Sequence, residues 1–226
     1  IYNSDDKYLS SKRKELPDGI WVGINKQSSY SHYPKYWIDK KGFIFENQKQ
    51  LFHTSVLKLP GKHNLQNLLL VIAAAREIGL DHTSIATSIS SFKAIPHRLE
   101  YLDKIHNISF YNDSKATNFD SSITGLKSIA APTILLAGGI QKKGDYIPWI
   151  EQIKQSTYGI VLFGLSANKL KNALLKSSYE GEIIVKQNLE EATIAAIDIA
   201  RKKISSSILL SPACSSFDQY QNFEER

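Results

Sequence analysis

The sequence predicts an α/β protein whose strand-rich first part is followed by a mostly parallel sheet flanked by helices. From about residue 108 to residue 210, short apolar runs alternate with longer stretches of helical periodicity. This alternation is typical of parallel sheets with right-handed crossovers. Residues 1–60 contain short strand patterns separated by turn residues. The pattern changes at Ala94-Ile95-Pro96, so we predict two domains, residues 1–95 and 96–226.

The strands of the first part are predicted from short runs of β-branched and aromatic residues. Ile20–Ile24 is one such run. Tyr36–Ile38 and Phe43–Phe45 are two more, and Asp39-Lys40-Lys41-Gly42 between them predicts a hairpin.

Two helices are predicted to close the first part. Ser55–Leu59 still alternates apolar and polar residues as a strand does, and Pro60-Gly61 ends that pattern. Leucine and isoleucine then recur at helical spacing over His63–Ile78, with Gly79 as the residue after the helix. A shorter helix is predicted over His82–Ser91.

The second part is predicted as alternating strands and helices. The strands are residues 108–111, 133–137, 160–163, 183–185 and 208–210, and the helices are residues 114–128, 146–155, 166–176 and 190–203.

Composition favours an ordinary globular protein. The chain has 226 residues, of which 42% are hydrophobic and 22% charged, with a formal net charge of +6. No apolar run approaches the roughly 20 residues that span a membrane. The basic clusters Lys12-Arg13-Lys14 and Arg201-Lys202-Lys203 are short and typical of solvated faces. We therefore predict no nucleic-acid partner and no membrane insertion.

A single cysteine, Cys214, excludes a disulfide within the chain and fits a cytoplasmic location. It invites interpretation as a nucleophile, but no histidine can be assigned to it, so we predict a small buried side chain. The sequence lacks methionine even at position 1 and stops at Glu224-Glu225-Arg226, within an apparent helix. We therefore expect a fragment of a longer protein.

Asn112-Asp113-Ser114-Lys115-Ala116-Thr117-Asn118 carries the strongest chemical signal. This polar run follows a predicted strand and precedes a predicted helix, and a helix start welcomes anions. Capping by Asp113 or Ser114 is the simpler interpretation. Capping does not explain Lys115, whose positive charge near the start of a helix is disfavoured by the helix dipole. This placement suggests that an anionic ligand binds there.

Other predicted strands also end in polar or small residues. They are followed by residues 138–145, 164–166 and 211–219. Ligands of open α/β sheets bind beyond these carboxyl ends. Gly138-Gly139 allows close approach of a ligand but matches no dinucleotide or phosphate-loop motif. Lys142 and Lys143 are both candidates to neutralise a carboxylate, or are solvated.

Two further candidates lie outside these loops. Arg98, in Pro96-His97-Arg98 at the predicted domain junction, is a phosphate clamp or a surface arginine, and position alone does not decide between them. Asn64 and Asn67 share one face of a helix start, where they read a purine edge or Asn64 caps the helix. No metal-ligand spacing is recognisable.

Four motifs occur together in the chain. They are G-K-H-N-L-Q-N at 61–67, I-P-H-R-L-E at 95–100, N-D-S-K-A-T-N at 112–118 and S-P-A-C-S-S-F-D-Q-Y-Q-N-F-E-E-R at 211–226. In this order and at these distances they resemble the Mur ligases, the ATP-dependent amide ligases of peptidoglycan synthesis, and the last two resemble the D-glutamate-adding members. The related folate polyglutamate synthases share the architecture but not the closing motif.

The resemblance implies part of a central ATPase-type domain, over residues 1–95, followed by a Rossmann-like amino-acid-binding domain. It implies a monomeric enzyme that activates the carboxylate of UDP-N-acetylmuramoyl-L-alanine as an acyl phosphate, which D-glutamate then attacks. His97, Arg98 and Lys115 would be catalytic. The residues implied to bind ATP are Asn64, Asn67, Arg98, Asp113 and Lys115. Those implied to bind D-glutamate are Thr117, Lys142, Ser216, Phe217 and Phe223.

The chain departs from the family in two respects. The phosphate loop, the main Mg²⁺ ligands and the UDP-binding domain would lie before residue 1, so we expect this chain alone to be inactive. Where the family pattern is G-G-D-G-K, the chain has Gly138-Gly139-Ile140-Gln141-Lys142. This change leaves the choice between Lys142 and Lys143 open.

Overall fold

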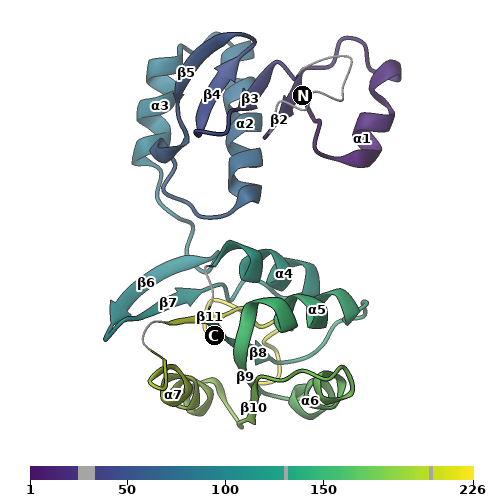
Figure 1. Cartoon of the computed structure of the whole chain (residues 1–226), viewed down its shortest axis with the longest axis vertical. Coiled ribbons are helices and arrows are strands. Elements are labelled where there is room, and N and C mark those ends of the chain that lie inside the picture. Colours follow the sequence, from purple (N-terminus) through teal and green to yellow (C-terminus); the bar gives the residue numbers. More distant parts are fainter. Residues whose placement is uncertain (25–33, 130–131, 204–205) are drawn as a thin grey trace. The chain divides into compact units, whose positions relative to one another are not determined.

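A computed structural model describes residues 1–24, 34–129, 132–203 and 206–226. The chain divides into two compact units, residues 1–93 and 94–226, and each is described by itself (Figure 1).

The first unit contains one five-stranded sheet in the order β1-β2-β3-β4-β5. Strands β1 to β3 pair in parallel, and β3, β4 and β5 pair antiparallel. The predicted hairpin is therefore confirmed. The strands are β1 (Tyr2–Asn3), β2 (Trp21–Gly23), β3 (Tyr36–Ile38), β4 (Phe43–Glu46) and β5 (Lys49–His53).

Helices α2 (Lys62–Glu77) and α3 (His82–Ser91) confirm the two helices predicted here. Leu68, Leu69 and Ile72 of α2 are buried with residues of the sheet. The strand-like alternation over residues 55–59 is wrong, because Thr54–Val56 forms a short 3₁₀ turn instead. The remaining elements are α1 (Lys7–Ser11) and a 3₁₀ turn at Arg13–Glu15.

The second unit contains a six-stranded sheet in the order β10-β9-β8-β11-β7-β6 (Figure 1). Every neighbouring pair is parallel except β6 with β7, which confirms the predicted mostly parallel sheet. The strands are β6 (Glu100–Ile105), β7 (Ile108–Asn112), β8 (Thr133–Gly138), β9 (Thr157–Phe163), β10 (Glu182–Val185) and β11 (Ser206–Leu210).

Helices cover both faces of this sheet. Leu135 and Ala137 of β8 are buried with α4 (Phe119–Ser128), α5 (Ile147–Ser156) and α6 (Ala167–Lys176). Ile134 and Leu136 are buried on the opposite face with α7 (Leu189–Ala200), since successive side chains of a strand alternate between faces.

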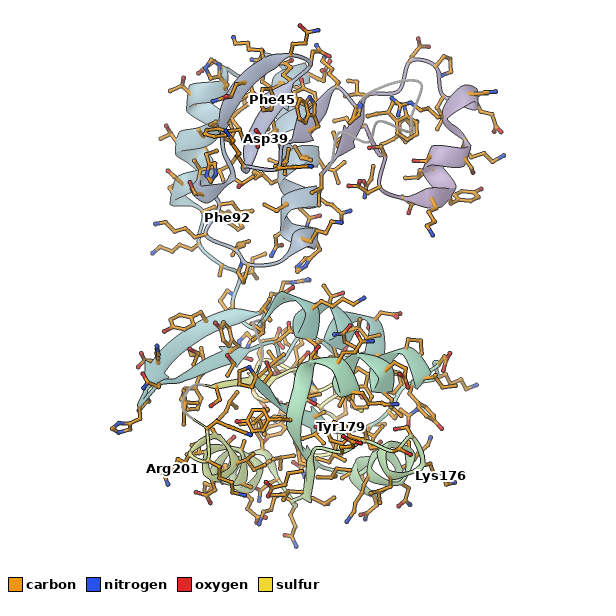
Figure 2. The ribbon with its side chains drawn as sticks, viewed as in Figure 1. Asp39, Phe45, Phe92, Lys176, Tyr179 and Arg201 are labelled. Atoms are coloured by element: carbon orange, nitrogen blue, oxygen red, sulfur yellow. The ribbon has the colours of Figure 1, made fainter. Side chains whose placement is uncertain are left out.

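Basic residues stand near the carboxyl ends of these helices, where they complement the helix dipole. Lys176 and Arg201 mark the ends of α6 and α7 in Figure 2. Tyr179, also labelled there, follows α6 and is hydrogen-bonded through its hydroxyl to Thr157 Oγ1 at 2.8 Å. Within the described ranges, no helix has the length and apolarity that crossing a membrane requires.

Three predicted bounds are corrected. Helix α4 begins at Phe119 rather than at residue 114. Helix α7 ends at Ala200, three residues before the predicted end at 203. Residues 224–226 end in a turn rather than a helix.

Candidate functional site

The order of strands brings four loops to the carboxyl edge of the second sheet. We call residues 113–118 the β7 loop, 139–145 the β8 loop, 164–166 the β9 loop and 211–226 the closing loop. Strand β11 lies between β7 and β8, and β8 pairs with β9. The predicted convergence of polar loops is therefore confirmed, while the ligand roles of their residues stay predictions.

Asp113 is the buried anchor of the β7 loop. It is 8% exposed, and its Oδ1 accepts a hydrogen bond from the Leu99 backbone N–H at 3.1 Å. Its Oδ2 accepts from Ser211 Oγ at 2.8 Å. One carboxylate therefore joins β7, the start of the closing loop and the segment that enters this unit.

Burial raises the pKa of Asp113 from 3.8 to about 6. The hydrogen bonds from Ser211 and Leu99, and the charge of Arg98, act in the opposite direction but are weaker than the loss of hydration. Asp113 therefore titrates near the physiological range.

The predicted start of a helix at residue 114, just before Lys115, is wrong. Asn118 is the N-cap of α4, and its side chain accepts from the Ser121 backbone N–H at 2.9 Å. Ser114 and Lys115 lie in a turn before it. Lys115 therefore lies outside the first turn of α4, and the helix dipole gives no reason to expect an anion beside it.

Lys115 instead contacts an aromatic ring. Its Nζ lies 3.6 Å from the ring centroid of Phe223, and the His97 ring packs edge-on against the same phenyl group at 5.9 Å. His97 Nδ1 is also 3.1 Å from Asn112 Nδ2. Two residues predicted to be catalytic, His97 and Lys115, therefore both contact Phe223, which was predicted to bind D-glutamate.

Arg226 ties the closing loop to the β7 loop. Its guanidinium donates to Ser114 Oγ at 3.1 Å, to Ser114 O at 2.8 Å and to Cys214 O at 3.1 Å. Ser114 Oγ in turn donates to Phe223 O at 2.7 Å. Burial lowers the pKa of Arg226 to about 10, so it remains protonated at neutral pH.

Lys142 reaches the β7 loop. Its Nζ donates to Thr117 Oγ1 at 3.3 Å. Lys143 is also exposed, and its side chain forms no hydrogen bond or ion pair with another described residue. Of the two lysines left open by the sequence, Lys142 is the one beside a predicted ligand of D-glutamate.

The β8 loop is fixed to the closing loop by a short bridge. Ile140 and Ser215 exchange two backbone hydrogen bonds of 2.9 and 3.0 Å. Gly139 has φ +121, and a Cβ there would lie well inside contact distance of Ser215 O. Glycine at 139 is therefore required for this contact between the loops.

The next residues of the closing loop differ in exposure. Ser216 is 2% exposed, whereas Phe217 is 69% exposed. Cys214 is fully buried, as predicted, and burial raises its pKa to about 12. A thiol in this state is a poor nucleophile.

The remaining predicted residues have different surroundings. Arg98 is exposed and close enough to lower the pKa of Asp113. Asn64 and Asn67 belong to the first unit, on α2. Asn64 does not cap this helix, since the N-cap is Gly61 and Asn64 Nδ2 donates to Pro60 O at 2.6 Å. Asn67 is exposed.

Sequence reasoning missed Ser211, Asp218 and Arg226. Each lies in the closing motif, but their partners are far along the chain, so local patterns gave no sign of the contacts. The dense run of polar residues in the motif was the available signal. Among the described residues, no group of three His, Cys, Asp or Glu side chains is arranged to hold a metal ion.

Comparison with known protein sequences finds close relatives. The chain is 77% identical over all 226 residues to UDP-N-acetylmuramoylalanine–D-glutamate ligase of Prochlorococcus marinus strain NATL2A, covering 48% of that protein. It is 45% identical to the protein of the same name from strain MIT 9313 and 41% identical to that of Parasynechococcus marenigrum strain WH8102, covering 49% of each. The chain thus spans about half the length of these relatives. No family profile matches it.

Solved structures share the fold at low sequence identity. MurF from Acinetobacter baumannii aligns with a TM-score of 0.63 and 16% identity, over 93% of this chain and 48% of that one. Folylpolyglutamate synthase from Mycobacterium tuberculosis, complexed with ADP, aligns with a TM-score of 0.65 and 12% identity, over 91% and 49%.

Proposed function

Because this chain belongs to the Mur ligase family, we propose that it is part of an ATP-dependent ligase that adds D-glutamate to UDP-N-acetylmuramoyl-L-alanine. The observation that carries the proposal is the 77% identity over all 226 residues to a ligase with that name. The relatives are about twice as long as this chain, so the proposal concerns a protein of their length. We propose further that this enzyme is cytoplasmic and monomeric.

We propose that the loops of the second unit bind D-glutamate. A dicarboxylate requires a cation and hydroxyl donors. Lys142 and Thr117 are in contact and offer an ammonium and a hydroxyl group. Ser216 would add a second hydroxyl group, and Phe217 and Phe223 would line the same pocket.

We propose that His97, Arg98 and Lys115 act at the reacting groups. Arg98 is exposed and therefore accessible to a phosphate, and Lys115 contacts Phe223 of the proposed amino-acid pocket. In this proposal both cations stabilise charge that develops as a carboxylate becomes an acyl phosphate. His97 would orient Phe223 and the β7 loop, since its ring packs on Phe223 and its carbonyl accepts from the Lys115 N–H at 3.0 Å.

ATP would supply the phosphoryl group for this activation. In the first unit, we propose that Asn64 and Asn67 are nucleotide-binding residues. In the second unit, we propose the same role for Arg98, Lys115 and Asp113, each unit being considered by itself. Both oxygens of Asp113 already accept one hydrogen bond, yet a carboxylate has further lone pairs for a ribose hydroxyl. The described residues offer no cluster for Mg²⁺, so we propose that its main ligands come from other parts of the protein.

The bond-forming step then needs little from this chain beyond position and charge. In the proposal, the D-glutamate amine attacks the acyl phosphate carbon through a tetrahedral intermediate. Phosphate leaves, and the amine loses a proton as the amide forms. Donors and cations at the carboxyl edge would hold the carboxylates away from the electrophile, so that only the amine reaches it.

The test is ATP-dependent phosphate release by the protein expressed from the complete native gene. We expect release with UDP-N-acetylmuramoyl-L-alanine that depends on D-glutamate, together with incorporation of radiolabelled D-glutamate. Incorporation of L-lysine or diaminopimelate instead would assign another amino acid. A native gene without a G-K-[ST] phosphate loop upstream of this sequence would favour a non-catalytic binding module.

A further inference from the structure

We propose that Asp218 is a positioning residue for the amino-acid pocket, holding Ser216 and Phe217 opposite Lys142. The inference deepens the proposed function, on which it rests. Asp218 is in the closing motif but is not among the predicted ligands. Its effect would pass through the loop that carries Ser216.

Three loops at the carboxyl edge form a closed triangle of contacts. The closing loop and the β8 loop meet through the bridge between Ser215 and Ile140. The β8 and β9 loops meet where the Ser166 N–H donates to Gly139 O at 3.0 Å and Ser166 Oγ accepts from the Gln141 N–H at 2.9 Å. The third side joins the closing loop to the β9 loop.

That third side depends on the carboxylate of Asp218. Its Oδ2 accepts from the Leu165 backbone N–H at 2.9 Å. Gly164 precedes this donor with φ +72, and a Cβ there would lie well inside contact distance of Asp218 Oδ2 and 3.1 Å from the Gly139 nitrogen. The carboxylate therefore packs directly against the backbone at Gly164, where a side chain of any other residue would occupy its space.

Because Asp218 follows Ser216 and Phe217 directly in the chain, its contact with Leu165 restrains these two residues. Ser216 and Phe217 lie between two fixed points, the bridge at Ser215 and the hydrogen bond of Asp218. The turn is closed from within, since Ser216 O accepts from the Gln219 and Tyr220 N–H groups at 3.1 and 2.9 Å. Releasing Asp218 would leave the turn intact and free its orientation relative to Lys142.

A purely structural role makes a different prediction from a positioning role. If Asp218 serves stability alone, its loss should lower the melting temperature and affect all substrates alike. If it positions Ser216 and Phe217, its loss should raise the KM for D-glutamate while the KM for ATP stays unchanged. Small displacements in a binding site are costly, and the loss of function is then specific to one substrate.

The experiment compares Asp218→Ala, Asp218→Asn and a surface control in the protein expressed from the complete native gene. We expect Asp218→Ala to raise the KM for D-glutamate about tenfold, with the KM for ATP within about twofold. Asparagine retains an acceptor for the Leu165 N–H, so it should restore most of the loss. The control is Asp198→Ala, which removes an exposed carboxylate paired with Arg201.

A second variant approaches the same contact from its other side. Gly164→Ala would displace the Asp218 carboxylate and should reproduce the selective rise in the KM for D-glutamate. Its control is Gly79→Ala, which has a similar positive φ of +90 with nothing within 4 Å of the added carbon. This pair separates the contact from backbone strain.

The outcomes separate the inference from the function on which it rests. If the unmodified protein does not use D-glutamate, the proposed function fails. If it uses D-glutamate but Asp218→Ala changes both KM values equally, or neither, the positioning role is overturned. Should Asp218→Ala fail to fold, the ratio of the two KM values in Gly164→Ala decides in the same way.

Discussion

Ser211 Oγ donates a 2.8 Å hydrogen bond to Asp113 Oδ2 across 98 positions of the chain. This contact joins the ends of the neighbouring strands β7 and β11 beneath helix α4. A Cβ on Gly125 of α4 would lie 2.6 Å from the same oxygen and 3.2 Å from Ser211 Oγ. The carboxyl edge of the sheet is thus built around a buried carboxylate.

The buried carboxylate gives the second unit a pH-dependent stability. Because burial raises the pKa of Asp113 from 3.8 to about 6, the folded protein holds a proton over a range where the unfolded chain has lost it. The resulting stabilisation is complete below about pH 4 and is lost as pH rises through about 6, a change on the order of 3 kcal/mol.

Asp113→Asn should remove this dependence. Its amide oxygen can accept from the Leu99 N–H while its nitrogen donates to Ser211 Oγ. We expect the variant to be at least as stable as the unmodified protein above pH 6 and to lose that advantage toward pH 4. Hydrogen exchange of residues 94–226 measures it. Parallel pH curves for the two proteins would contradict the prediction.

Gly125→Ala should destabilise the protein, although alanine normally favours a helix interior by about 1 kcal/mol. The added carbon would press on Asp113 Oδ2. Overpacking of this kind costs roughly 1–3 kcal/mol. Urea unfolding should show a lower midpoint than for Lys127→Ala, an exposed change on the same helix. A raised midpoint would mean that the carboxylate can move away.

Arg226→Ala should destabilise the second unit by about 2–4 kcal/mol, since it leaves Ser114 O and Cys214 O without their donor. Arg201→Ala is the matched control, because that arginine is exposed and forms an ion pair with the exposed Asp198 at 3.4 Å. It should change the free energy of unfolding by no more than about 0.5 kcal/mol. Equal effects of the two variants would show that burial of Arg226 is unimportant.

The sequence predicted the strands and helices well where one pattern dominated. The β8 run Ile134–Ala137 is apolar throughout because both faces are buried, and helix α2 has a regular apolar stripe. Strand β6 was not predicted. Five of its six residues are exposed, so its sequence, Glu-Tyr-Leu-Asp-Lys-Ile, lacks the apolar alternation that a half-buried strand shows.

The site was predicted only in part, for a physical reason. Loops that follow parallel strands converge whatever their sequence, so their meeting could be expected. The start of α4 depended on which of several polar residues caps it. Asn118 caps the helix rather than Asp113 or Ser114, and the Asp113 carboxylate instead accepts hydrogen bonds from Ser211 and Leu99. Such distant partners leave no local pattern.

Lys115→Ala should leave the fold intact and depress turnover in the complete enzyme. The lysine contributes a contact with the Phe223 ring at 3.6 Å, for which about 0.5–1 kcal/mol is typical of a partly exposed pair. Its proposed role at the acyl phosphate would make kcat fall much more than stability does. Thermal melting and kcat measured together test this, and an unchanged kcat would remove Lys115 from the mechanism.

Lys142 and Lys143 are neighbours with the same charge, and they provide the sharpest test of the D-glutamate pocket. Lys142 Nζ lies 3.3 Å from Thr117 Oγ1, whereas Lys143 is exposed without a described partner. Both alanine variants remove one positive charge, so long-range electrostatics change equally. We expect Lys142→Ala to raise the KM for D-glutamate by about tenfold or more, as loss of a charged hydrogen bond of about 1.5–3 kcal/mol implies. Lys143→Ala should stay within about twofold, because no hydrogen bond from the Lys143 side chain to another described residue is lost and its exposed charge is screened by solvent. Equal effects would show that the net charge of the loop, rather than the Lys142–Thr117 pair, binds the carboxylate.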